Sequence, residues 1–280
     1  MGVGCSRYRE VMTDSALISG TTAAGVPFVA RQAVSASAPV IVAWHLLDPP
    51  RTPAAFAAAL PLAGLDATVF YLGLPLSGDR MPDGGFEEIM RRAGEDVVMQ
   101  LFAPILEGAI AEFPAAFAEL SERFGVADGA ALGLLGGSAG SAVAAGVLAS
   151  GTSGASAAVL VSPMLQLAPN IDAMADFLGG DAYSWHPESR RVAAEMDFVA
   201  RADEITATDA AVRVIAGLDD EPAFVGPARL FAVAAGADLQ LMEGVAHALA
   251  EEPGMEPAPQ TEAAADYDVL AVEWFSEHLL

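Results

Sequence analysis

Apolar and polar residues follow one another along this chain in blocks typical of strands that alternate with helices. Most of the strand-like blocks are short, mainly apolar runs, as expected of strands covered on both faces of a parallel sheet. Longer segments with helical spacing separate them, which predicts an α/β fold with a parallel or mostly parallel sheet. The predicted strands are residues 26–31, 39–45, 67–72, 131–135, 157–161, 211–215 and 239–242.

Helical spacing extends over residues 86–124, where apolar side chains recur every three or four positions. Pro104 and Pro114 are expected to break or kink this helix, because proline removes a backbone hydrogen bond. Shorter helices are predicted at residues 54–60, 139–149, 225–235 and 263–280.

Residues 165–207 differ from the rest, because aromatic and Met side chains stand there among polar residues, in a pattern of helices and loops. They separate two predicted core strands. We therefore expect a core domain formed by residues 1–164 and 208–280, with residues 165–207 as a small helical cap inserted into it.

The composition argues against several classes of partner. The formal net charge is −24, and all 13 basic residues are Arg. Such a chain repels phosphate backbones, so nucleic-acid binding and polyanionic substrates are not expected. The single Cys, Cys5, excludes an intramolecular disulfide framework. Assembly with further copies of the chain is left open.

No secretory signal pattern is present, so a cytoplasmic location is expected, and either Met1 or Met12 could be the start. Residues 129–171 contain no charged side chain, which would suggest a membrane span. Gly and Ser residues interrupt that stretch, however, and a buried strand–helix–strand unit explains it better. A membrane partner is therefore not expected.

A glycine-rich turn at residues 136–140, GGSAG, lies between the predicted strand 131–135 and the predicted helix 139–149. It matches G-x-S-x-G in the strand–turn–helix context that gives this motif its meaning. Small residues are needed there because the strand and helix backbones nearly touch. Ser138 would stand at a helix N-terminus, where backbone N–H groups and a partial positive charge face the site. Ser138 is the candidate nucleophile, and a turn without catalysis is the alternative.

A serine hydroxyl needs a base to become a good nucleophile. Of the four His residues, His247 follows the last predicted strand, where a loop can bring a base to the serine. His278 falls in the terminal helix and His186 in the inserted segment, whereas His45 ends an early strand. His247 is the candidate base.

The base in turn needs a carboxylate that fixes its tautomer. Asp219 and Asp220 follow the predicted strand 211–215, and Asp220 is preferred because a Gly-x-x-Asp spacing gives the turn room to aim it. Asp219 stays open as the alternative, and Glu221 is a weaker third candidate. The resulting chain order of serine, acid and histidine is the one described for this motif.

Stabilising a tetrahedral oxyanion requires two N–H donors. The N–H of Ala139 at the start of the helix is one candidate, and that of Leu46, after the predicted strand 39–45, is the other. His45 could orient that loop without transferring a proton. The residues proposed to line the substrate pocket are His45, Met164, Phe177, Tyr183 and Trp185.

With GGSAG at 136–140, GLDDEPAF at 217–224 and EGVAHALAEEP at 243–253, the chain resembles the α/β-hydrolase superfamily. The similarity is to small esterases and to dienelactone-hydrolase-like or serine-peptidase-like members. It departs from the dienelactone hydrolases proper, which carry Cys in place of Ser138, and from esterases with an HGGG motif. The resemblance implies about eight mostly parallel strands flanked by helices, a Ser-His-Asp triad, and no metal or other cofactor.

We therefore expect a serine hydrolase that cleaves a small-molecule ester through an acyl-enzyme on Ser138. Two alternatives remain from the residues alone. An acyltransferase would use the same triad with an alcohol or amine in place of water, and a non-hydrolytic binding protein would use the same fold without the chemistry.

Overall fold

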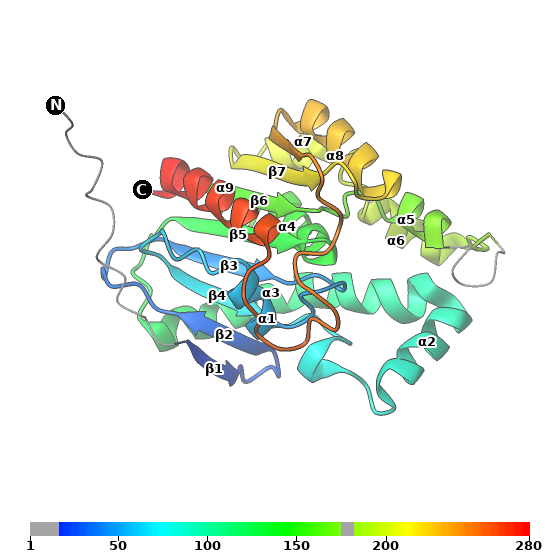
Figure 1. Ribbon diagram of the computed structural model, residues 1–280, viewed down its shortest axis with the longest axis horizontal. Helices are drawn as coiled ribbons and strands as arrows, with labels where there is room; N and C mark the ends of the chain where they lie inside the picture. Colours follow the sequence, from blue (N-terminus) through cyan, green and yellow to red (C-terminus); the bar gives the residue numbers. More distant parts are fainter. Residues whose placement is uncertain (1–16, 175–181) are drawn as a thin grey trace.

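The computed structural model describes residues 17–174 and 182–280, with a central eight-stranded sheet in the order β1-β2-β4-β3-β5-β6-β7-β8 (Figure 1). β2 is antiparallel to both of its neighbours, and the other neighbouring pairs are parallel. The mostly parallel sheet predicted from the sequence is confirmed. The strands are β1 Ile18–Thr21, β2 Pro27–Arg31, β3 Val40–Trp44, β4 Thr68–Leu72, β5 Leu132–Gly137, β6 Ala157–Val161, β7 Ala211–Gly217 and β8 Asp238–Met242.

Helices cover both faces of the sheet (Figure 1). One apolar layer packs α1 and α9 against the sheet, and the other packs α3, α4 and α8 against the opposite face. The helices are α1 Pro53–Ala59, η1 Gly78–Arg80, α2 Gly85–Asp96, η2 Val97–Phe102, α3 Ala103–Phe124, α4 Ala139–Ala149, α5 Leu167–Met174, α6 Pro187–Glu195, α7 Ala202–Thr206, α8 Pro222–Ala235 and α9 Glu262–Leu279.

The order of the strands reverses direction at β3 and β5, which lie side by side although β4 separates them in sequence. In this parallel register Trp44, the last residue of β3, lies beside Gly136 near the end of β5. The loops that follow these two strands therefore meet at one edge of the sheet. Open α/β sheets place their ligand sites at such a switch point.

The helical stretch Gly85–Phe124 is divided into α2, η2 and α3. It is long and apolar enough, by length and composition alone, to cross a membrane. Its residues Val98, Leu106 and Leu120 are, however, completely buried in the layer against the sheet, as expected of a core helix. The proline prediction is half right: Pro104 lies in the first turn of α3, but α3 continues through Pro114.

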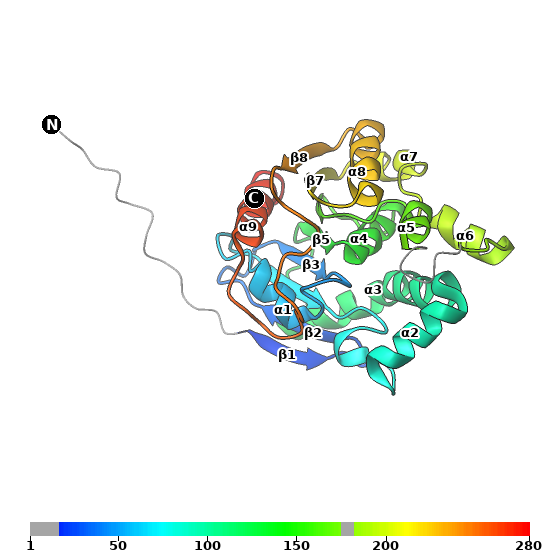
Figure 2. The ribbon, with the colours of Figure 1, turned by 45° about the vertical axis from the view of Figure 1, so that its right-hand side comes forward.

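The segment predicted as a cap, residues 165–207, connects β6 to β7 and carries α5, α6 and α7 in its described part. In Figure 2, α5 and α6 lie on the same side of the molecule as α2, which precedes β5 in the chain. Elements from two separate connections thus stand together beyond the carboxyl ends of the strands.

Candidate active site

Ser138 occupies a sharp turn between the end of β5 and the start of α4, with φ 49° and ψ −114°. This is a strained conformation for a residue with a side chain, and such strain is common at functional sites. A Cβ atom added to Gly136 would overlap the carbonyl of Gly140, and one added to Gly140 would overlap the carbonyl of Trp44. The two outer glycines of the motif are therefore required by backbone packing, as the sequence predicted.

Ser138, His247 and Asp220 form one line of hydrogen bonds. His247 Nε2 lies 2.8 Å from Ser138 Oγ, and His247 Nδ1 lies 2.8 Å from Asp220 Oδ2. The second Asp220 oxygen accepts from the N–H of Glu221 at 2.7 Å. With Nδ1–H donating to the carboxylate, Nε2 is the acceptor that faces the serine hydroxyl.

The choice between neighbouring acids is decided by burial and direction. The Asp220 side chain is completely buried beside His247, whereas Asp219 and Glu221 are exposed. The Asp219 N–H donates to the carbonyl of Val245 at 3.0 Å, which joins the loop after β7 to the loop after β8. This pairing brings the acid-bearing loop against the histidine-bearing loop.

His45, directly after the end of β3, connects the loop after β3 to the loop after β4 through hydrogen bonds. His45 is completely buried; its Nδ1 lies 2.6 Å from the Leu46 carbonyl, and its Nε2 accepts from the Leu74 N–H at 3.1 Å. Burial lowers the pKa of His45 to about 4, so the ring is neutral near pH 7 and joins two loops without serving as a base.

The oxyanion prediction for the loop after β3 concerns Leu46. Leu46 is completely buried, and its side chain packs where a Cβ on Gly137 would otherwise be. It is not among the residues that line the cavity. The next residue, Leu47, lines the cavity together with Ser138 and Ala139. Leu47 is therefore a second candidate for the N–H donor in this loop.

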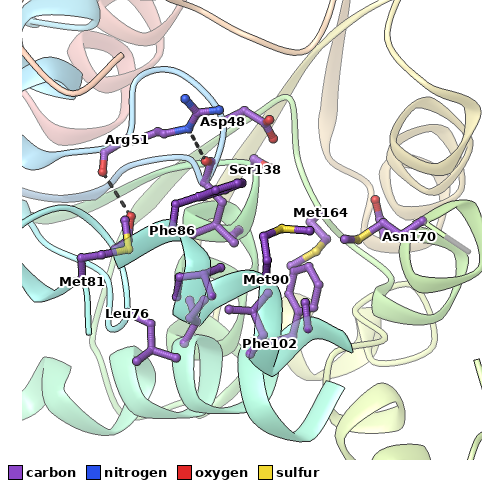
Figure 3. A pocket seen from close by; sticks show the side chains of 18 of the residues that line it. Asp48, Arg51, Leu76, Met81, Phe86, Met90, Phe102, Ser138, Met164 and Asn170 are labelled. Carbon is purple, nitrogen blue, oxygen red and sulfur yellow. Dashed lines mark hydrogen bonds between the residues drawn. The ribbon is translucent and has the colours of Figure 1, made fainter. Parts of the chain in front are cut away.

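A cavity of about 400 Å³ opens above Ser138 (Figure 3). Its walls are mainly apolar, as is usual for small-molecule sites. The connection between β4 and β5 contributes the largest share of the lining residues, and others come from the loop after β3, the start of α4, residues near α5 and α8, and the loop before α9. The lining residues are Leu47, Asp48, Arg51, Leu76, Ser77, Met81, Phe86, Ile89, Met90, Ala93, Leu101, Phe102, Ile105, Ser138, Ala139, Met164, Asn170, Met174, Glu221, Phe224 and Met255.

The pocket predicted from the sequence overlaps this cavity only at Met164. The Tyr183 hydroxyl instead donates to Asp96 at 2.6 Å, and its ring packs edge-on against Trp185 at 4.8 Å between centroids. His45 lies beneath the loop, as described above. Phe177, like Cys5, falls outside the described residues.

The walls contributed by α2 and η2 were missed. The sequence carried a signal for them, because Ile89, Met90 and Ala93 recur at helical spacing and stand out from the polar residues around them. The spacing predicts a helix but does not say what its apolar side contacts. In the structure these three side chains line the cavity. Within residues 17–174 and 182–280, no cluster of three or more His, Cys, Asp or Glu side chains could hold a metal ion.

No family model matches the sequence, and no curated protein sequence matches it significantly. Solved structures do match. The Thermus thermophilus protein TT1662 superposes with a TM-score of 0.64 at 16% identity, over 94% of this chain and 98% of that one. The Pyrococcus furiosus esterase Pf2001 gives a TM-score of 0.56 at 12% identity, over 95% and 93% of the two chains.

A puromycin-hydrolyzing peptidase from Mycobacterium tuberculosis gives a TM-score of 0.63 at 18% identity. The match covers 98% of this chain but 42% of the peptidase. Together with the sheet order, these likenesses confirm that the chain has the α/β-hydrolase fold, as its sequence predicted.

Proposed function

We propose that this protein is a serine hydrolase that cleaves small carboxylic esters through an acyl-enzyme on Ser138. The observation that carries the proposal is the unbroken hydrogen-bonded line from Ser138 Oγ through the His247 ring to the buried Asp220 carboxylate, at 2.8 Å for each contact. This line ends at the floor of a cavity of small-molecule size. Each member stands where acyl transfer requires it.

In the proposed first step, Ser138 Oγ attacks the ester carbonyl while His247 Nε2 takes the hydroxyl proton. The carbonyl oxygen becomes an oxyanion. The Ala139 N–H, which begins α4 and has no partner within the helix, can donate to it. We assign the second donor to Leu47, since Leu46 does not reach the cavity.

Collapse of the tetrahedral intermediate breaks the bond to the leaving alcohol, which receives its proton from His247. Water then enters, gives a proton to His247 and attacks the acyl carbon, so that Ser138 is released with a carboxylic acid as product. Asp220 accepts the hydrogen bond from His247 Nδ1 and would stabilise the imidazolium that forms in each half-reaction. The apolar cavity walls would receive the acyl chain.

The test is hydrolysis of a p-nitrophenyl ester series, from acetate to decanoate, by the wild-type protein and by Ser138→Ala. We expect the wild type to cleave esters, with a chain-length optimum set by the cavity, and the variant to lose activity by about 10⁴-fold or more. A folded wild-type protein that cleaves none of these esters would contradict the ester assignment. Adding an acceptor alcohol to the same assay and analysing the products would show an acyltransferase.

A further inference from the structure

Two carboxylates that form no ion pair with an arginine of the described residues face the catalytic cavity. Asp48 follows Leu47 at the cavity wall, and its Oδ2 lies 3.6 Å from His247 Nε2, with half of its side chain exposed. Glu221 lines the cavity from the start of α8 and makes no ion pair within the described part of the chain. The carboxylates come from separate loops, after β3 and after β7.

The cation in the described cavity wall is already neutralised. Arg51 forms a two-pronged ion pair with Glu252 at 2.6 and 3.1 Å and donates further to the carbonyls of Leu47 and Pro253. Figure 3 shows Arg51 beside Asp48, with its guanidinium hydrogen-bonded to the backbone of the loop. Four of its five N–H donors are thus used within the protein, and Glu252 balances its positive charge.

A buried amide adds a third acceptor to the same cavity. Asn170, on α5, is only 4% exposed and lines the wall (Figure 3). Its Nδ2 donates to the carbonyl of Gln166 at 2.8 Å and to that of Ala223 at 3.4 Å. These two bonds fix the orientation of the amide, and its Oδ1 receives no hydrogen bond from the described residues. That oxygen is therefore free to accept a hydrogen bond from a ligand in the cavity.

Asp48, Glu221 and Asn170 therefore offer acceptors to a substrate in this cavity, and two of the three are carboxylates. An oxyanion that forms on the substrate beside Asp48 would also be repelled by that carboxylate. A protonated amine on the substrate would donate hydrogen bonds to these acceptors. Its positive charge would also offset the repulsion between Asp48 and the oxyanion. An anionic substrate would be repelled by the two carboxylates, and a neutral one would gain no attraction from them.

We propose that the natural substrate is an ester or amide with a protonated amine close to its scissile carbonyl, recognised by Asp48 and Glu221, with Asn170 as a further acceptor. The proposal rests on the serine-hydrolase function stated above and names its substrate class. The amine must lie within a few bonds of the carbonyl. Asp48 Oδ2 lies 3.6 Å from His247 Nε2, and the same nitrogen lies 2.8 Å from Ser138 Oγ. The Asp48 carboxylate is therefore close to the reacting serine.

Three phenyl esters of nearly equal size test the proposal: the 3-ammoniopropanoate, the butanoate and the hemisuccinate. Wild-type kcat/KM should fall in that order, from cation to neutral to anion. Asp48→Asn and Glu221→Gln should each reduce the ratio of cationic to neutral kcat/KM by roughly fivefold, the effect of one partly exposed ion pair. Asp203→Asn removes an equally negative but remote side chain on α7 and should leave the ratio unchanged.

Binding to Ser138→Ala, measured by NMR titration with β-alaninamide and butanamide, keeps this inference separate from the hydrolase function. Tighter binding of β-alaninamide that is lost on adding Asp48→Asn supports the inference even when no ester is cleaved. Equal binding of the two amides overturns it, whatever the hydrolysis rates. An equal loss of kcat/KM on cationic and neutral esters in Asp48→Asn also overturns it, because Asp48 would then act on His247 and not on the substrate.

Discussion

The two regions on either side of Ser138 are built differently. The turn that joins β5 to α4 consists of tightly packed backbone, whereas the cavity wall consists of side chains that can change rotamer. The turn around Ser138 leaves no room for a single methyl group at Gly136 or Gly140. The opposite wall instead contains the flexible thioethers of Met81, Met90, Met164, Met174 and Met255. Met adapts its shape to irregular partners. The comparison teaches that this molecule keeps its reacting atoms rigid and leaves its substrate surface adaptable.

The largest effect should come from the rigid side, at the triad acid. Asp220→Asn removes the acceptor that fixes the His247 tautomer, and kcat for a cleaved ester should fall by about 10⁴-fold with little change in melting temperature. Asp219→Asn is the matched control, because the neighbouring side chain is exposed, and its kcat should stay within about twofold of wild type. Equal losses in the two variants would show that the acid has been misassigned.

Gly140→Ala should damage the same region through sterics. The added methyl would overlap the Trp44 and His45 carbonyls, so we expect the free energy of unfolding to fall by about 3 kcal/mol or more, measured by urea denaturation. Gly226→Ala places the same methyl group in open space on α8 and should be neutral or stabilising by up to about 1 kcal/mol. A well-folded Gly140→Ala protein of wild-type stability would contradict the close approach of the backbones.

A third effect concerns the loop over the site and depends on pH. The His45 pKa falls from an unfolded value near 6.5 to about 4 in the folded protein, so the unfolded chain binds the extra proton first. His45 therefore lowers stability as the pH decreases from 6.5 towards 4, by about 2 kcal/mol at pH 4.5. Urea denaturation of the wild type and of His45→Gln at pH 7 and pH 4.5 should show a smaller pH-dependent loss in the variant. Parallel losses would contradict the role of His45.

The smallest effect on stability should come from the adaptable wall. Met90→Leu keeps the volume of the side chain, so the free energy of unfolding should change by less than about 1.5 kcal/mol. The chain-length optimum for p-nitrophenyl esters should nevertheless shift, because Met90 lines the cavity. Val233→Leu, on the exposed face of α8, provides a control that should alter neither. An unchanged optimum in Met90→Leu would remove this wall from the acyl site.

The same contrast explains which features the sequence could predict. Strands β3 to β6 lie between helices and read as short, mainly apolar runs, so they were predictable from the pattern of apolar residues along the chain. β1 was not, because it is an edge strand with Ile18 and its neighbours mostly exposed and no apolar pattern. The triad could be predicted for two reasons. The close backbone packing around Ser138 requires a recognisable glycine motif, and Asp220 and His247 follow the ends of predicted strands.

The cavity could not be predicted in the same way, because it depends on how distant segments pack. The helix over residues 86–124 is interrupted at Asp96, where the backbone is extended and the carboxylate accepts from Met99 N–H, and not at Pro114. Asp96 also accepts from Tyr183 and contacts His186 of a different connection. The pattern of apolar and polar residues within one segment does not predict contacts with a distant segment. These contacts hold Tyr183 against Asp96 at the end of α2, whereas other α2 residues, such as Met90, line the cavity.

The measurement that tests the central claim most directly is labelling with a fluorophosphonate probe, followed by intact-mass analysis and peptide mapping. An activated serine reacts with such a probe, whereas an ordinary surface hydroxyl does not. We expect one adduct per chain on Ser138, no adduct in Ser138→Ala, and much slower labelling in His247→Ala, which stays folded but lacks the base. A folded wild-type protein that takes up no probe, or one labelled equally well in Ser138→Ala, would contradict the proposal that Ser138 is the nucleophile.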